Sequence, residues 1–75
     1  MKALDKYIRM ANQIAANLTA QAPDNAHLAT AAHIEKFWDP RMRATLDEHV
    51  AAGGEGLSSI ALKALQTLAL ADDTP

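Results

Sequence analysis

The sequence predicts an all-α fold, a small compact array of four short helices. Apolar residues recur at helical spacing in four segments of about 12–19 residues each. Prolines, glycines and cap-forming residues separate these segments, and every loop between them is short. The 75 residues leave room for one domain with one small core. We therefore expect a single helical domain over residues 1–71 and a frayed tail over residues 72–75.

The first helix is expected over residues 2–20. Its apolar side chains fall within about 120° of the helix circumference, which is typical of a surface helix with one buried stripe. They are Leu4, Tyr7, Ile8, Ala11, Ile14, Ala15 and Leu18. Met10 lies outside this stripe, among polar residues. A methionine in that place is an adaptable contact, either at the rim of the core or against a partner.

The second helix is expected over residues 24–37, with Pro23 or Asp24 near its N-terminal cap. One side of this helix carries the residues expected in the core, which are His27, Ala31, Ile34 and Trp38. Leu28 and Phe37 lie at opposite edges of that side. A small domain covers only one edge easily, so we expect Leu28 or Phe37 to be partly exposed.

A helix stop and a helix start adjoin at Trp38-Asp39-Pro40. Pro40 has no backbone N–H and disfavours the α conformation of the residue before it, so the second helix should end near Trp38. Asp39 is expected to cap a third helix whose first residue is Pro40. The two helices must then meet at a corner, with Trp38, Asp39 and Pro40 holding its shape.

The third helix is expected over residues 40–52. Arg43 and Asp47, one turn apart, should form an exposed pair. Gly53 or Gly54 should end the helix in a left-handed conformation. The buried side chains of the helix should be Met42, Leu46, His49 and Val50.

The fourth helix is expected over residues 59–71, capped by Ser58. Leu57 precedes the cap and can pack against Leu62. The apolar arc of this helix covers nearly half its circumference, so the helix needs cover on more than one side. We expect the isolated chain to pair with itself through this face, as a homodimer that buries Leu62 or Leu65.

Composition excludes several classes of protein. The chain has no cysteine, so it can form no disulfide, thiolate metal site or cysteine nucleophile. Its formal charge of −2 argues against nucleic acid as the main partner. No apolar run is long enough to span a bilayer, and charges near the start argue against a signal peptide. We expect a soluble cytoplasmic protein with no membrane partner.

We expect no catalytic, cofactor-binding or metal site. His27 and His33 point about 240° apart on one helix, and residues 47–49 are consecutive, so no pair of metal ligands converges. The run Gly53-Gly54-Glu55-Gly56 follows a helix rather than a strand and lacks a Walker lysine, which indicates a turn. Helix capping accounts for one of the two serines at positions 58 and 59, and no base accompanies them.

Aromatic and arginine side chains concentrate at the predicted corner, where Phe37, Trp38, Arg41 and Arg43 are close in sequence. This composition matches protein–protein hot spots. The helix dipole disfavours cations in the first turn of a helix, so local helix stability does not account for Arg41 or Arg43. The corner is therefore the first candidate for a contact surface. The alternatives are that both rings lie in the core and that the arginines are solvated surface charges.

Several strings of residues also carry a resemblance to a known family. They are Arg9-Met10-Ala11-Asn12-Gln13-Ile14, His33-Ile34, Phe37-Trp38-Asp39-Pro40-Arg41-Met42-Arg43, Leu46, His49 and Gly54-Glu55-Gly56-Leu57. With these strings, the chain resembles the delta subunit of NAD-dependent, molybdenum-containing formate dehydrogenase. The string from Phe37 to Arg43, at its distance from Arg9, is the specific part of the resemblance.

The resemblance implies an accessory, non-catalytic subunit with no cofactor of its own. The oxidation of formate, with a molybdenum cofactor, iron–sulfur clusters, FMN and NAD, would belong to larger subunits. This chain would bind the large molybdenum-containing catalytic subunit and support assembly or stability of the complex. The residues expected to include its contacts are Arg9, Met10, Gln13, His33, Phe37, Arg41 and Arg43.

Two other functions stay open at this point. A transient maturation factor would assist insertion of the molybdenum cofactor into the same enzyme and then leave, so it would be absent from the finished complex. A small nucleic-acid-binding helical domain would use Arg9, Arg41 and Arg43, and its binding would depend strongly on salt.

Overall fold

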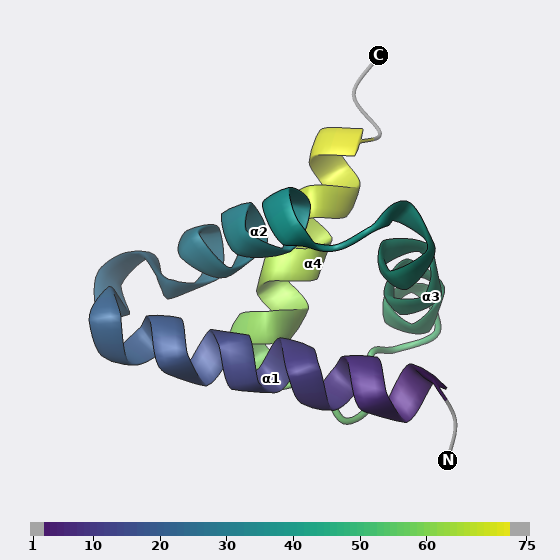
Figure 1. The fold of residues 1–75 in the computed structure, drawn as a ribbon, viewed down its shortest axis with the longest axis horizontal. Coiled ribbons are helices and arrows are strands. Elements are labelled where there is room, and N and C mark those ends of the chain that lie inside the picture. Colours follow the sequence, from purple (N-terminus) through teal and green to yellow (C-terminus); the bar gives the residue numbers. More distant parts are fainter. Residues whose placement is uncertain (1–2, 73–75) are drawn as a thin grey trace.

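Four α-helices and one short 3₁₀ turn form the part of the chain that the computed structural model describes, residues 3–72 (Figure 1). They are α1 (Ala3–Gln21), the 3₁₀ turn η1 (Pro23–Asn25), α2 (Ala26–Phe37), α3 (Pro40–Ala51) and α4 (Ser59–Asp72). No strand occurs among these residues. The predicted all-α array of four helices is confirmed.

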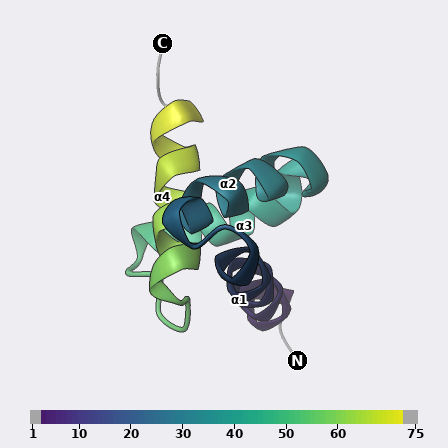
Figure 2. The same cartoon turned by 90° about the vertical axis from the view of Figure 1, so that its left-hand side faces the viewer.

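Helix α4 lies across the other helices and supplies one wall of the core. In Figure 1, α1 runs along the bottom, α2 lies above it and α3 is seen almost end-on at the right. Figure 2, turned by 90°, shows α4 standing on one side of this group. It contacts α1, α2 and α3, and its Ala61, Ala64 and Leu65 are fully buried. The broad apolar arc expected on this helix is therefore covered from three directions.

This cover corrects one expectation about self-association. Leu65 has no exposed surface, so it cannot be a contact between two copies of the chain, whereas Leu62 is half-buried. The reason is that three helices, rather than one or two, pack around α4. The helix continues to Asp72, and the rest of the expected frayed tail, residues 73–75, lies outside the described residues.

The core is formed by one or two large side chains from each of α2, α3 and α4, with small ones between them. Ile34, Leu46 and Leu65 are fully buried. Thr30 is buried as well, and its hydroxyl donates to the carbonyl of Ala26 at 2.7 Å, so its polar atom is satisfied. The stripe expected on α1 does face this core: its alanines are buried, and its larger side chains are partly buried against the cluster, among them Leu4, Tyr7, Ile8 and Ile14.

The corner between α2 and α3 is built by Trp38, Asp39 and Pro40. The backbone of Trp38 is extended, with φ −93° and ψ 140°, and its N–H still donates to the carbonyl of Ile34 at 2.9 Å. Oδ1 of Asp39 accepts the N–H of Met42 at 2.9 Å, and Pro40 takes the first helical position. The expected cap is confirmed, and the chain turns because Pro40 cannot continue α2.

Two glycines end α3. The N–H of Gly53 donates to the carbonyl of Val50 at 3.0 Å and that of Gly54 to the carbonyl of His49 at 2.9 Å, which is the Schellman pattern. Gly54 has a φ of 68°, and a Cβ there would stand 2.6 Å from Cδ1 of Leu62. The backbone angle favours glycine at this position, and a larger residue would also displace the terminal methyl group of Leu62.

Asn12 fastens the loop between α3 and α4 to α1. Its Nδ2 donates to the carbonyl of Gly56 at 2.8 Å, and its Oδ1 accepts the N–H of Ser58 at 2.8 Å. The hydroxyl of Ser58 in turn accepts the N–H of Ala61 at 3.3 Å, which confirms the cap expected for the last helix. One amide side chain thus positions the start of α4 against α1.

Candidate partner-binding surface

The two aromatic residues that end α2 have opposite environments. Trp38 is 8% exposed and belongs to the core, where its ring centroid lies 6.0 Å from that of Tyr7 on α1. Phe37 is 66% exposed. The alternative in which both rings lie in the core is therefore wrong, because Phe37 points 100° away from Trp38 around the helix and no element covers it. Leu28, at the other edge of α2, is 50% exposed, so both edges, rather than one, are left open.

Two side chains of α2 accompany the exposed ring of Phe37. The ring of His33, one turn earlier, has its centroid 4.7 Å away at an interplanar angle of 43°. The ammonium of Lys36 lies 5.6 Å from the centroid of the Phe37 ring, within the range of a cation–π contact. His33, one of the contact residues expected from the sequence, therefore lies beside Phe37. Lys36 was not singled out in the sequence, although its place next to Phe37 could have suggested it.

A hollow of about 310 Å³ lies between α1 and α2 on the side of His33. Its lining is Ile14, Asn17, Leu18, Gln21 and His33. The sequence did not predict this hollow. Helical periodicity shows which side chains share one flank of a helix, but not the distance from that flank to the next helix. The hollow thus lies on the same side of α1 and α2 as His33.

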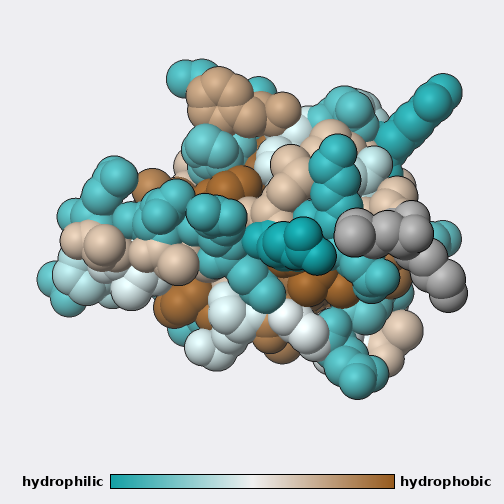
Figure 3. Space-filling model, turned by 60° about the horizontal axis from the view of Figure 1, so that its bottom comes forward, coloured by the Kyte–Doolittle hydropathy of each residue, from teal (hydrophilic) through white to brown (hydrophobic). Residues whose placement is uncertain are grey.

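The three candidates on α1 differ in how they are buried. Met10 is half-buried and packs against the core cluster, so it lies at the rim of the core. Arg9 and Gln13 are exposed. Figure 3 brings the bottom of the molecule forward. Hydrophilic side chains are spread over this face, and apolar side chains are visible between them.

The two candidate arginines of α3 do not share one environment. Arg41 is exposed. Arg43 is half-buried, and so is Asp47. Nε of Arg43 and Oδ1 of Asp47 are both out of contact with solvent. The exposure expected for Arg43 and Asp47 is therefore wrong, since both side chains are half-buried. The corner between α2 and α3 places Glu35 and Trp38 beside them.

These side chains line a second hollow, of about 450 Å³, at the inside of the corner: Glu35, Trp38, Pro40, Arg43, Ala44 and Asp47. Glu35 and Phe37 are two residues apart on α2 and so point about 160° away from each other. Arg43 consequently lies on the flank of α2 opposite to Phe37. The contact residues expected from the sequence are thus divided between two flanks, with His33 and Phe37 on one and Arg43 on the other.

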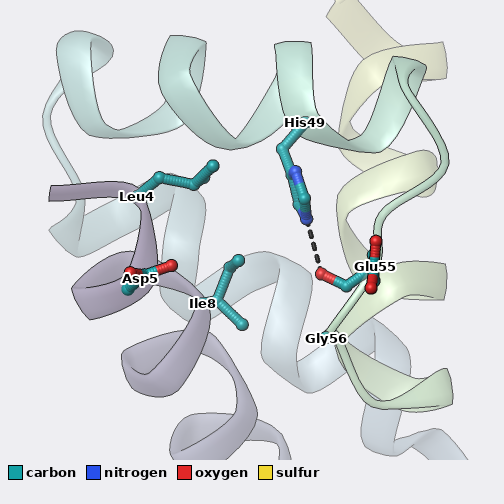
Figure 4. Close-up of a pocket in the computed structure, with 6 residues that line it drawn as sticks. All are labelled: Leu4, Asp5, Ile8, His49, Glu55 and Gly56. Carbon is teal, nitrogen blue, oxygen red and sulfur yellow. Dashed lines mark hydrogen bonds between the residues drawn. The ribbon is translucent and has the colours of Figure 1, made fainter. Parts of the chain in front are cut away.

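A third hollow, of about 380 Å³, lies where α1 meets the end of α3 (Figure 4). In this hollow the imidazole of His49 points towards the following loop. Its Nε2 donates to the carbonyl of Glu55 at 2.6 Å. Leu4, Asp5 and Ile8 of α1 and Gly56 of the loop complete the lining. His49 is half-buried, and its hydrogen bond closes the loop against α3.

Residues 3–72 contain no group of three or more His, Cys, Asp or Glu side chains placed to hold a metal ion. Among the same residues, no helix combines the length and the apolar character that crossing a membrane requires. Of the large apolar side chains exposed on the described surface, Phe37 is more exposed than Leu28.

Comparison with known proteins gives the family. The model of the family described as NADH-dependent formate dehydrogenase delta subunit FdsD matches residues 6–65. Searches of curated proteins and of solved structures found no match. The matched segment runs from α1 into α4 and includes the corner with Phe37 and Trp38. The chain therefore belongs to the family of delta subunits of NADH-dependent formate dehydrogenase.

Proposed function

We propose that this chain is a non-catalytic accessory subunit of a formate dehydrogenase. It binds the large molybdenum-containing catalytic subunit and supports assembly or stability of the complex. The family match over residues 6–65 carries this proposal. The molybdenum cofactor, iron–sulfur clusters, FMN and NAD belong to the larger subunits, and the chain works with them in the cytoplasm.

The physical character of the chain supports a role in binding. A domain of this length buries only about 60–65% of the surface that its unfolded chain exposes, and its stability is expected to be about 4–11 kcal/mol. Each of the four helices contributes to one core among the described residues. The exposed aromatic side chain at the end of α2 is better suited to a protein surface than to a small substrate.

The composition of the purified enzyme tests this proposal. The chain is produced with its formate dehydrogenase, with an affinity tag on the catalytic subunit, and the active complex is analysed by native mass spectrometry. A subunit is present at one copy for each catalytic subunit. A chain that appears only in complexes lacking the molybdenum cofactor would be a maturation factor, and a chain absent from every complex would contradict the proposal.

Deletion of the chain tests whether it stabilises the finished complex or assists its assembly. If the chain stabilises the finished complex, an enzyme made without it contains its molybdenum but loses subunits or activity faster on dilution or heating. Addition of the purified chain then restores the lifetime of the complex. An enzyme that is indistinguishable from the complete one in composition and lifetime would argue against both roles.

A further inference from the structure

Phe37 and Leu28 are a natural pair for comparison, because both are large apolar side chains exposed on α2. Single exposed apolar side chains are normal on protein surfaces and need no explanation. What distinguishes Phe37 is its surroundings. His33 lies against its ring, and the Lys36 ammonium lies near its face. The fold arranges polar and cationic groups around this ring and leaves the ring itself open.

Lys36 is the charged group that the structure places at the Phe37 ring. Lys36 is exposed and lies at the ring, and the exposed Arg41 follows four residues later, in the first turn of α3. Two carboxylates are also near in sequence, one of them on the other flank of α2. Glu35 lines the hollow on the opposite flank of α2, and Oδ1 of Asp39 accepts the cap hydrogen bond from Met42. A surface that fits this one therefore carries negative charge around an apolar centre.

The stacking of Phe37 also favours its use as an anchor. The ring of Phe37 already contacts His33 and lies near the Lys36 ammonium in the free chain. A side chain that is already restricted loses less conformational entropy on binding. Aromatic side chains inserted into desolvated pockets are the commonest anchors of protein interfaces.

A second copy of the chain is a poor occupant for this surface. A twofold interface centred on Phe37 would bring the same patch of each copy together. Lys36 and Arg41 of one copy would then approach the like charges of the other, which costs energy. The charge pattern favours a different, acidic surface.

We infer that Phe37 anchors this chain to its catalytic subunit by entering an apolar pocket whose rim carries carboxylates, and that Lys36 and Arg41 pair with that rim. The inference rests on the proposed function, since it names the chemistry of the same interface. It places the contact on the α1–α2 side of the corner and leaves the hollow around Arg43 outside the interface.

Affinity measurements with matched variants test the inference. The purified catalytic subunit is immobilised, and the full chain and its variants are bound to it in the presence of nuclease. We expect Phe37→Ala to raise Kd by about 30-fold or more, as for an aromatic hot spot. We expect Leu28→Ala, an equally apolar truncation on the other edge of α2, to change Kd by less than about threefold. Circular dichroism should show the same helix content in both variants.

The charged rim has its own test. The double variant Lys36→Glu, Arg41→Glu should raise Kd by about tenfold or more, mainly through slower association, and the difference should shrink as salt is raised from about 50 to 500 mM. Equal or tighter binding by this variant would overturn the acidic rim. Arg43→Glu, a charge reversal in the hollow that lies outside the proposed interface, should change Kd by less than Arg41→Glu does.

The outcomes separate this inference from the proposed function. If the unaltered chain does not bind the catalytic subunit, the proposed function itself fails. If the unaltered chain and Phe37→Ala bind equally well, or if Leu28→Ala weakens binding as much as Phe37→Ala, only the inference is overturned. An association that nuclease abolishes would make nucleic acid the occupant and would also overturn it.

Discussion

Adjacent residues at the end of α2 serve different purposes because helix geometry separates them by 100°. Trp38 completes the core beside Tyr7, whereas Phe37 lies in solvent beside His33 and Lys36. The sequence predicted that one edge of α2 would be exposed but not that both would be. It also could not reveal the burial of Arg43, because that burial depends on how the corner between α2 and α3 brings Glu35 and Trp38 beside it.

This difference predicts that two neighbouring truncations change stability by very different amounts. Trp38→Ala removes a buried ring and should lower the free energy of unfolding by about 3–5 kcal/mol, a large part of what so small a domain has. Phe37→Ala should change the free energy of unfolding by less than about 0.5 kcal/mol. Urea unfolding followed by circular dichroism measures both, since Trp38 is the single tryptophan and fluorescence is lost with it. Comparable losses in the two variants would contradict the assigned environments.

At the scale of the helices, the start and end signals in the sequence were informative. Asp39 and Pro40 begin α3, Gly53 and Gly54 end it, and Ser58 caps α4. Each of these signals acts within a few residues, so the local sequence contains it. The start of α2 was less well predicted, since residues 23–25 form a separate 3₁₀ turn before the α-helix begins at Ala26.

The contact between Asn12 and the loop before α4, in contrast, is not contained in the local sequence. Asn12 bonds Gly56 and Ser58, which lie 44 and 46 positions further along the chain. In the sequence Asn12 is simply one of several polar residues on the outer side of the first helix. No local pattern distinguishes it from Gln13, its exposed neighbour. Contacts of this range depend on the packing of whole helices and were beyond the sequence argument.

Asn12 and Gln13 therefore make a matched pair for a prediction at this scale. Asn12→Ala breaks two hydrogen bonds and should lower the free energy of unfolding by about 1–2 kcal/mol, after a small gain in helix propensity. Gln13→Ala should leave it within about 0.5 kcal/mol of the unaltered chain. Chemical unfolding of both variants, in parallel, is the measurement. If Asn12→Ala were as stable as Gln13→Ala, the amide would not be fastening the loop.

At the scale of the whole molecule, the four helices share one core and leave no cluster of ionisable side chains on the described surface that resembles a metal site. The fold class and the family could both be predicted from the sequence. The candidate surface was predicted only in part. Phe37 and His33 lie together, but Arg43 lies in a hollow with Glu35 on the other flank. Which residues share a face depends on the angles between helices, which periodicity alone does not contain.

The central claim is that the chain docks through the exposed ring at the end of α2, and site-specific photocrosslinking tests it most directly. A benzoylphenylalanine in place of Phe37, and in a matched chain in place of Leu28, is irradiated within the assembled formate dehydrogenase, and the crosslinked peptides are identified by mass spectrometry. We predict that position 37 crosslinks to the molybdenum-containing catalytic subunit, to a segment rich in aspartate or glutamate, and that position 28 does not. Crosslinking from position 28 with none from position 37 would contradict the account.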